Sequence, residues 1–204
     1  MKYEKIRQQV LEAIMDAVEQ GLIHGTSGNI ALRDDVDDVV AITPSGIAYK
    51  GMTPGDIAIV DMNGKWLDGP YKPSSEVPMH LACMRARKDV RATVHTHGMF
   101  ATIMAMGENP KLLPVTPPQC EFVPVGVVPF TMPGSNDVAD KVVKALGETG
   151  RAVLIKNHGM FCCGKNMKAA MAATIYTEEM ATTAYYAKVL GSFESMPEEA
   201  VRKM

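Results

Sequence analysis

Three histidines in the 204-residue sequence have a spacing that suits metal chemistry. His95 and His97 are separated by one residue at the end of a short apolar run. Side chains two positions apart on an extended backbone point to the same side, so both imidazoles can reach one ion. His158 also follows an apolar run and precedes a glycine, which makes it the candidate third ligand. Three imidazole ligands with one open position are typical of a catalytic zinc site.

These histidines also have simpler interpretations. An isolated His-x-His pair is usually not a metal site, and a single histidine at a corner more often makes structural hydrogen bonds. The metal interpretation requires the strands before His95 and His158 to end at the same edge of a sheet. His24 and His80 have no comparable partner in the sequence, and we expect both to be structural.

Glu76 is the candidate for proton transfer. It follows two serines at the predicted start of a helix, where the helix dipole favours an ionised carboxylate. Glutamate is also common in the first turn of a helix simply because it stabilises the helix. The residues alone leave the catalytic and the structural interpretation of Glu76 open.

Three short segments combine small or hydroxyl-bearing residues with predicted turns, at 26–29, 43–46 and 74–75. Backbone amides at turns and helix starts bind phosphate without a fixed positive charge. Each segment by itself is also explained as an ordinary turn. A complete Walker pattern is absent, which disfavours an ATPase, and no Gly-x-Gly-x-x-Gly supports a dinucleotide site.

Apolar periodicity and turn signals predict the elements that position these residues. A first helix is expected to end at Gly21, with an apolar stripe formed by Ile6, Val10, Ile14 and Val18. Further helices are expected at 74–87, 98–106, 136–146 and 167–190. Strands are expected at 30–33, 39–42, 57–61, 65–67, 91–95, 152–156 and 160–163, with broken strands at 113–130. The Asn63-Gly64 hairpin signal requires at least one antiparallel pair in a mixed α/β fold.

The composition narrows the classes of function. The length fits a single domain spanning residues 1–204. A net charge of −2 disfavours nucleic-acid binding, and no apolar run is long enough to cross a membrane. The N-terminus has no signal-peptide core, and the four cysteines form no Cys-x-x-Cys pair. These features predict a mature cytoplasmic protein in a reducing compartment.

Taken in order, five motifs resemble the class II aldolase/epimerase/adducin-head family. They are Gly-Thr-Ser-Gly-Asn at 25–29, Thr-Pro-Ser-Gly at 43–46, Ser-Ser-Glu at 74–76, His-Thr-His at 95–97 and Asn-His-Gly at 157–159. The resemblance covers nearly the whole chain and is to the branch that cleaves fuculose 1-phosphate. It implies three layers, with a mixed, largely antiparallel central β-sheet flanked by helices. It also implies a homotetramer with its sites near the subunit interfaces.

The same resemblance implies the roles of individual residues. His95, His97 and His158 match the ligands of one zinc ion per subunit. Glu76 matches the catalytic residue, which also binds the metal when substrate is absent. The residues that match the substrate-phosphate cradle are Gly28, Asn29, Ser45, Gly46, Ser74 and Ser75.

The implied reaction is the zinc-dependent cleavage of a ketose phosphate, similar to fuculose 1-phosphate, into dihydroxyacetone phosphate and an aldehyde. It passes through a metal-stabilised enediolate to which Glu76 returns a proton. Two departures concern the aldehyde fragment. Thr116 stands where the family has a tyrosine, and the sequence ends at Met204, before the family's C-terminal tyrosine. The residue that handles the aldehyde is therefore not identified.

Other reactions fit the same residues. A ribulose-5-phosphate 4-epimerase would rejoin the two fragments, and a dehydratase or decarboxylase would break another bond. A non-catalytic binding module like the adducin head is a further alternative. The presence of all three histidines and Glu76 argues against a binding module.

Overall fold

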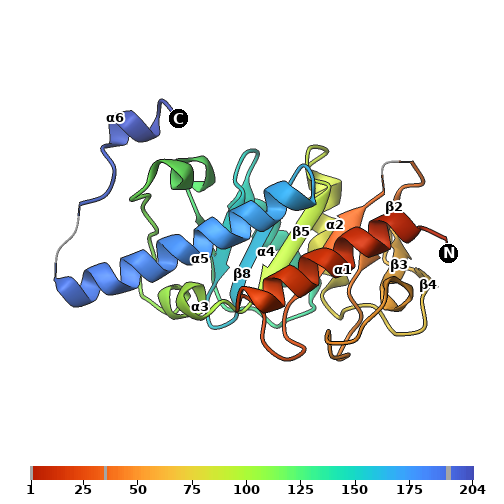
Figure 1. Cartoon of the computed structure of the whole chain (residues 1–204). Helices are drawn as coiled ribbons and strands as arrows, with labels where there is room; N and C mark the ends of the chain where they lie inside the picture. The colour runs from red at the N-terminus through yellow and green to blue at the C-terminus, as the bar shows by residue number, and fades with distance from the viewer. Residues whose placement is uncertain (1, 35, 192–193) are drawn as a thin grey trace.

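The protein is built around a β-sheet covered by helices on both faces (Figure 1). The computed structural model describes residues 2–34, 36–191 and 194–204. Within that part of the chain the sheet has eight strands in the order β4-β3-β2-β1-β5-β8-β7-β6. Neighbouring strands are antiparallel except for the parallel pair β6 and β7. The structure confirms the predicted α/β class with a mixed, largely antiparallel sheet.

The strands are β1 (Asn29–Arg33), β2 (Val39–Ile42), β3 (Ala58–Asp61), β4 (Trp66–Asp68), β5 (Ala92–Thr96), β6 (Gly126–Val128), β7 (Ala152–Ile155) and β8 (Gly159–Gly164). The α-helices are α1 (Glu4–Glu19), α2 (Val77–Ala86), α3 (Met99–Ala105), α4 (Asn136–Leu146), α5 (Met167–Leu190) and α6 (Glu198–Val201). Two short 3₁₀ helices are η1 (Pro54–Asp56) and η2 (Pro117–Phe122).

Two hydrophobic cores lie on opposite faces of the sheet. Helices α1 and α5 cross one face, in front of the strands in Figure 1, whereas α2 and α4 pack on the other. Because strand side chains alternate, adjacent residues contribute to different cores. Cys162 lies in the α1/α5 core and Cys163 in the α2/α4 core, as their alternation on a strand predicts. No helix in the described ranges has the length and apolarity needed to cross a bilayer.

The first helix shows how helical periodicity selects the buried residues. Ile6, Val10 and Ile14 are buried as predicted, but Val18 is 37% exposed and Ala17 is buried instead. A repeat of four residues drifts away from the 3.6-residue turn, so the stripe moves back by one position at the end of the helix.

The segment at 113–130 differs from the predicted broken strands. It contains η2, which begins after Thr116, and only the short strand β6 at 126–128. Thr116 and Gln119 form a capping box that starts the helix, and Pro117 occupies its first position. Consecutive prolines lack the N–H groups that a strand needs, whereas the start of a helix tolerates them.

Strands β5 and β7 are both antiparallel to β8, so they run in the same direction and end at the same edge of the sheet. The turn between β7 and β8 therefore lies beside the end of β5, where Thr96 pairs with Met160. This arrangement confirms the common edge that a joint site for the two histidine corners requires.

Candidate functional site

One cavity, of about 270 Å³, collects most of the predicted site residues. Its lining includes all six candidates for phosphate binding together with Glu76, His97 and His158. His95 lies behind this lining and is fully buried. The complete lining is Thr26, Ser27, Gly28, Asn29, Pro44, Ser45, Gly46, Ser74, Ser75, Glu76, His97, Pro133 and His158. The structure thus brings together residues that are up to about 130 positions apart in the sequence.

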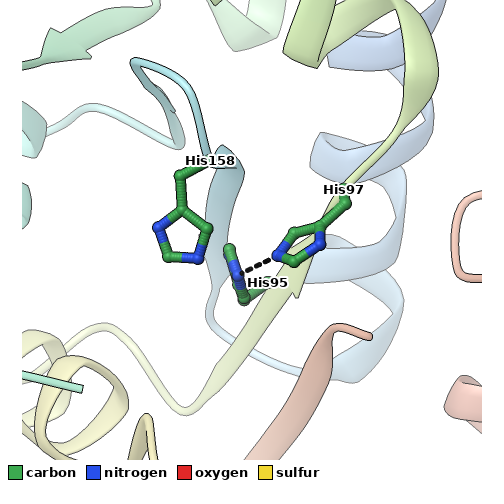
Figure 2. Close-up of side chains that lie close together, drawn as sticks. All are labelled: His95, His97 and His158. Carbon is green, nitrogen blue, oxygen red and sulfur yellow. Dashed lines mark hydrogen bonds between the residues drawn. The ribbon is translucent and has the colours of Figure 1, made fainter. Parts of the chain in front are cut away.

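The three histidines face one another from two segments of the sheet edge (Figure 2). His95 is on β5 and His97 follows it, while His158 is in the turn before β8. The Nε2 atoms of His95 and His97 are 3.1 Å apart. One candidate ligand atom from each ring lies within 4.8 Å of the others. Gly159 permits this close approach, because a Cβ atom there would collide with the carbonyl oxygen of Thr96.

Hydrogen bonding determines which nitrogen of His95 is available. Its Nδ1 lies 2.8 Å from the carbonyl oxygen of Met160, which can only accept, so Nδ1 carries the proton. In the neutral ring Nε2 then presents a lone pair, and Glu76 Oε2 lies 3.2 Å from it. Burial lowers the pKa of His95 to about 4, which opposes protonation of Nε2. Two acceptors therefore face each other in a buried space.

A cation between these acceptors resolves the conflict, and the donor set suits a divalent metal that prefers imidazole. The pKa of His97 is also lowered, mainly by burial and then by the neighbouring ring of His158. Neutral rings are the form in which histidines bind metal. The residues present therefore fit the metal that the sequence predicts at His95, His97 and His158.

Glu76 lies just before α2 rather than in its first turn. Glu76 is the N-cap residue of α2, but its carboxylate caps no amide of the helix. The Ser74 hydroxyl accepts the Glu76 backbone N–H at 3.2 Å, and the carboxylate turns toward the cavity. There, Oε2 accepts the side-chain amide of Asn29 at 2.8 Å, and Oε1 lies 3.3 Å from His158 Nε2.

These neighbours keep Glu76 ionised. Burial by itself would raise the pKa of the carboxyl group, but the rings of His158 and His95 and the Asn29 amide outweigh it. The net effect holds the pKa of Glu76 well below its usual range. Glu76 is therefore an anion that lies directly beside the three imidazoles, which suits a metal-assisted proton transfer.

The turns on the other side of the cavity are tied to one another through the backbone. The Ser45 amide donates to the carbonyl of Lys72 at 2.9 Å, and the Ser74 amide donates to that of Thr43 at 3.1 Å. These two amides are therefore not free for a ligand. Across the described ranges, the amides of Gly46 and Ser75 have no protein acceptor and remain available.

Two buried residues that support the site were missed from the sequence. His80, expected to be structural, is buried and hydrogen-bonded, but its partner at 2.5 Å is Oδ1 of Asn29. The Tyr49 hydroxyl donates to the carbonyl of Gly28 at 2.6 Å. His80 stands four residues after Glu76, a spacing that places it one turn along the same helical face. This spacing is the feature of the sequence that could have indicated a place for His80 beside Glu76.

Thr116 and His24 are not part of this site. Thr116 is at the start of η2 and does not line the cavity. His24 is exposed.

Comparison with known proteins adds independent information. The family described as Class II Aldolase and Adducin N-terminal domain matches residues 8–185. A 5-deoxy-D-ribulose 1-phosphate aldolase of Bacillus thuringiensis serovar kurstaki is 32% identical over 207 residues, covering 100% of this chain and 95% of the relative. An L-ribulose-5-phosphate 4-epimerase of Salmonella paratyphi B is 32% identical over 199 residues, covering 91% of this chain and 86% of the relative.

A solved structure described as L-fuculose 1-phosphate aldolase has a TM-score of 0.90 and 31% sequence identity to this chain. The similarity covers 99% of this chain and 95% of that structure. Sequence and fold therefore point to the same group of proteins.

Proposed function

The chain belongs to the Class II Aldolase and Adducin N-terminal domain family, and on this premise we propose that it is a zinc-dependent sugar-phosphate aldolase. Its substrate would be a ketose 1-phosphate, cleaved into dihydroxyacetone phosphate and an aldehyde. The observation that carries the proposal is a cavity with an ionised carboxylate and three imidazoles at one end and turns with unpaired amides at the other.

The imidazoles would hold one zinc ion per subunit through His95, His97 and His158. When bound, zinc supplies Lewis acidity that stabilises negative charge developing on the substrate oxygens. The protein's own contribution is to hold the three rings at fixed orientations, as the bond from His95 to the Met160 carbonyl illustrates. Rings fixed in this way need not reorganise when a ligand binds.

Glu76 would move the proton at carbon. Cleavage removes an aldehyde from one carbon of the ketose, and that carbon must then receive a proton. In the reverse direction the ionised carboxylate takes this proton from dihydroxyacetone phosphate. The protein neighbour of Oε1 is His158 Nε2 at 3.3 Å, so Oε1 would be the oxygen available for this transfer when His158 holds the metal.

The turns would bind the phosphate. The free amides of Gly46 and Ser75 and the serine hydroxyls are donors of the kind that cradle phosphate at loop corners. The lining contains no lysine or arginine, so this grip would depend on backbone dipoles. Holding the phosphate fixes the position of the reacting carbons relative to Glu76.

The names of the relatives narrow the substrate. Fuculose 1-phosphate and 5-deoxyribulose 1-phosphate are both ketose 1-phosphates that end in a methyl group. Both would give dihydroxyacetone phosphate, with an aldehyde of different length. We therefore place the substrate in the class of deoxyketose 1-phosphates with five or six carbons.

Product analysis tests the proposal. The purified protein, loaded with zinc, is incubated with L-fuculose 1-phosphate, 5-deoxyribulose 1-phosphate and L-ribulose 5-phosphate in parallel. A coupled reductase measures dihydroxyacetone phosphate, and NMR identifies every product. The proposal expects dihydroxyacetone phosphate from at least one ketose 1-phosphate.

An epimerase is the second candidate, because the Salmonella relative that carries that name is as similar in sequence as the aldolase. If only the C4 epimer of L-ribulose 5-phosphate forms, the aldolase proposal is wrong and the epimerase takes its place. Loss of water or carbon dioxide without fragmentation would identify a dehydratase or decarboxylase. A chain that binds no metal and converts no sugar would be a binding module.

The proposal includes a cytoplasmic homotetramer with sites near the subunit interfaces. Several large apolar side chains are exposed, which suits contacts between subunits, namely Phe130, Met132, Tyr186, Val189 and Leu190. Light scattering should give four times the 22.1 kDa mass of one chain. A monomer mass in solution would contradict this part of the proposal.

A further inference from the structure

Three buried polar side chains form a chain of hydrogen bonds behind Glu76. The Glu76 carboxylate accepts the Asn29 amide at 2.8 Å, Asn29 Oδ1 lies 2.5 Å from His80 Nε2, and His80 Nδ1 lies 2.6 Å from the Thr93 hydroxyl. His80 and Thr93 are fully buried, and Asn29 is nearly so. The chain joins the cavity to helix α2 and to strands β1 and β5.

The charge of the carboxylate determines the direction of every bond in this chain. An ionised Glu76 can only accept, so Asn29 must present its N–H₂ group to it and its Oδ1 to His80. That oxygen can also only accept, so His80 Nε2 carries the ring proton. Nδ1 is then the acceptor for the Thr93 hydroxyl. The reverse orientation of Asn29 would place its oxygen against the carboxylate.

A purely structural role does not explain a histidine at this position. The ring packs edge-on against Phe161 at 5.3 Å, within the core formed by α2, α4 and the sheet. An apolar side chain of similar size would fill such a place without needing polar partners. Within the part of the chain described, the hydrogen-bond partners of His80 are Asn29 and Thr93, and Asn29 connects it to Glu76.

We propose that His80 is a positioning residue that, through Asn29, fixes the rotation of the Glu76 carboxylate. One oxygen is then held toward His95 while the other stays directed at His158 and the cavity. The inference rests on the proposed function in one respect, since it takes Glu76 as the group that binds the metal and moves the proton. It also gives Asn29, predicted only to bind phosphate, a second task.

The test compares His80→Gln with His80→Met. Glutamine and methionine have similar shapes, but only glutamine can place an N–H group where Nε2 of the histidine lies and donate it to Asn29. The first measurement is the zinc affinity of the metal-free protein, obtained by competition with a chelator. The second is kcat and KM for the substrate found in the product analysis. Thermal unfolding of both variants reports any general loss of stability.

Loss of a residue that orients a metal ligand typically costs about 10–100-fold in metal affinity or activity. We expect His80→Met to lose zinc affinity and kcat to about this extent, with KM unchanged, and His80→Gln to recover most of the loss. Equal shifts in the two variants, or wild-type values in His80→Met, would overturn the proposal. If His80→Met cannot be purified folded, His80→Asn replaces it, because asparagine can pair with Thr93 but is too short to reach Asn29.

The zinc measurement separates this inference from the proposed function. If the wild-type protein cleaves no ketose phosphate, the proposed function fails, and the zinc affinities of the two variants still decide the role of His80.

Discussion

The two ends of the cavity are built in different ways. The histidine end, formed by His95, His97, His158 and Glu76, depends on side chains that are largely buried and held by further hydrogen bonds. The turn end, formed by Gly28, Ser45, Gly46, Ser74 and Ser75, depends on backbone groups in three turns, two of which are tied to each other by main-chain bonds. At the first end the identity of each side chain matters, and at the second the path of the backbone matters.

This difference separates chemistry from recognition. Nε2 of His95 can bind a metal only if the imidazole ring is present and its Nδ1 proton is held by the Met160 carbonyl, which leaves a lone pair on Nε2. An amide donor such as that of Gly46 is present whatever the side chain, provided that the turn keeps its conformation. Side-chain substitutions should therefore damage the histidine end most, and backbone substitutions the turn end.

The largest effect is expected from His95→Ala. The substitution removes a ligand whose ring is fixed by the Met160 carbonyl, so zinc binding and activity should both fall to background. Elemental analysis and the aldolase assay measure the two losses, and far-ultraviolet circular dichroism confirms folding. His24→Ala is the matched control, because the His24 side chain is exposed and does not line the cavity. Metal-free wild-type protein with full activity would refute the role given to the histidine end.

The next largest effect is expected from Glu76→Gln. The amide keeps the size of the side chain but cannot take up a proton, so kcat should fall by about 10²–10⁴-fold. Zinc should still bind when supplied in excess, since the three histidines remain, but with an affinity lowered at least as much as in His80→Met, because an amide is a weaker ligand than a carboxylate. Exchange of solvent deuterium into dihydroxyacetone phosphate isolates the proton step. Exchange at the wild-type rate in this variant would assign the proton to another residue.

A pair of glycine substitutions examines the turn end. Gly28 has φ +90, and a Cβ atom there would lie 2.8 Å from the carbonyl oxygen of His95. Gly46 has φ +70 with open space around it, so alanine adds only backbone strain. Strain of this kind costs about 1–3 kcal/mol. We expect Gly28→Ala to raise KM and lower the melting temperature clearly more than Gly46→Ala.

The two glycine variants distinguish the two ends of the cavity. Both glycines belong to the turn end, but of the two only Gly28 also lies against the backbone of His95. Gly46→Ala should raise KM while leaving zinc affinity unchanged. Gly28→Ala should also disturb zinc binding, through the backbone of His95. If both variants bind substrate like the wild type, the turns do not hold the phosphate.

The last effect concerns the stability of the metal-free protein and its dependence on pH, and it involves no change in activity. Burial lowers the pKa of His95 to about 4 and that of His80 to about 3, whereas a histidine in the unfolded chain titrates near 6.5. As the pH falls from about 6.5 toward 4, the unfolded chain takes up protons that the native chain refuses, so the free energy of unfolding decreases. For His95 the decrease is on the order of 3 kcal/mol.

Urea unfolding of the metal-free protein between pH 7 and pH 4.5 measures this dependence. The turn end contributes nothing to it, because its glycines and serines do not titrate in this range. His80→Gln should flatten the dependence, and His24→Gln, which replaces an exposed histidine, should not. Stability that rises as the pH falls would contradict the assignment of neutral, buried rings.

Local patterns were enough to predict most of the fold and the composition of the cavity. The Asn63-Gly64 signal predicts a hairpin, and β3 and β4 form that antiparallel pair. Glycine-flanked corners after apolar strands predict that His97 and His158 meet, and they do. These predictions succeed because a turn or a strand is determined by residues within a few positions of one another.

Most of what the sequence did not reveal depends on contacts between distant segments. The hydrogen bond from His80 to Asn29 joins positions 51 residues apart, and periodicity along one helix does not reveal it. Glu76 turns away from α2 because Asn29 and the imidazoles attract its carboxylate, a competition that only the folded sheet creates. The segment at 113–130 is rich in valine, which favours strands, but the prolines at 117–118 start a 3₁₀ helix.

The position of β5 between β1 and β8 has a consequence for how the site can be lost. His95 belongs to an interior strand with hydrogen-bonded neighbours on both sides and buried residues along its length. Fraying at the edges of a sheet does not reach such a strand, so its amides should exchange with solvent only when the whole protein opens. His95 would then leave the site only in that same global event, so it would keep its place for as long as the native state lasts.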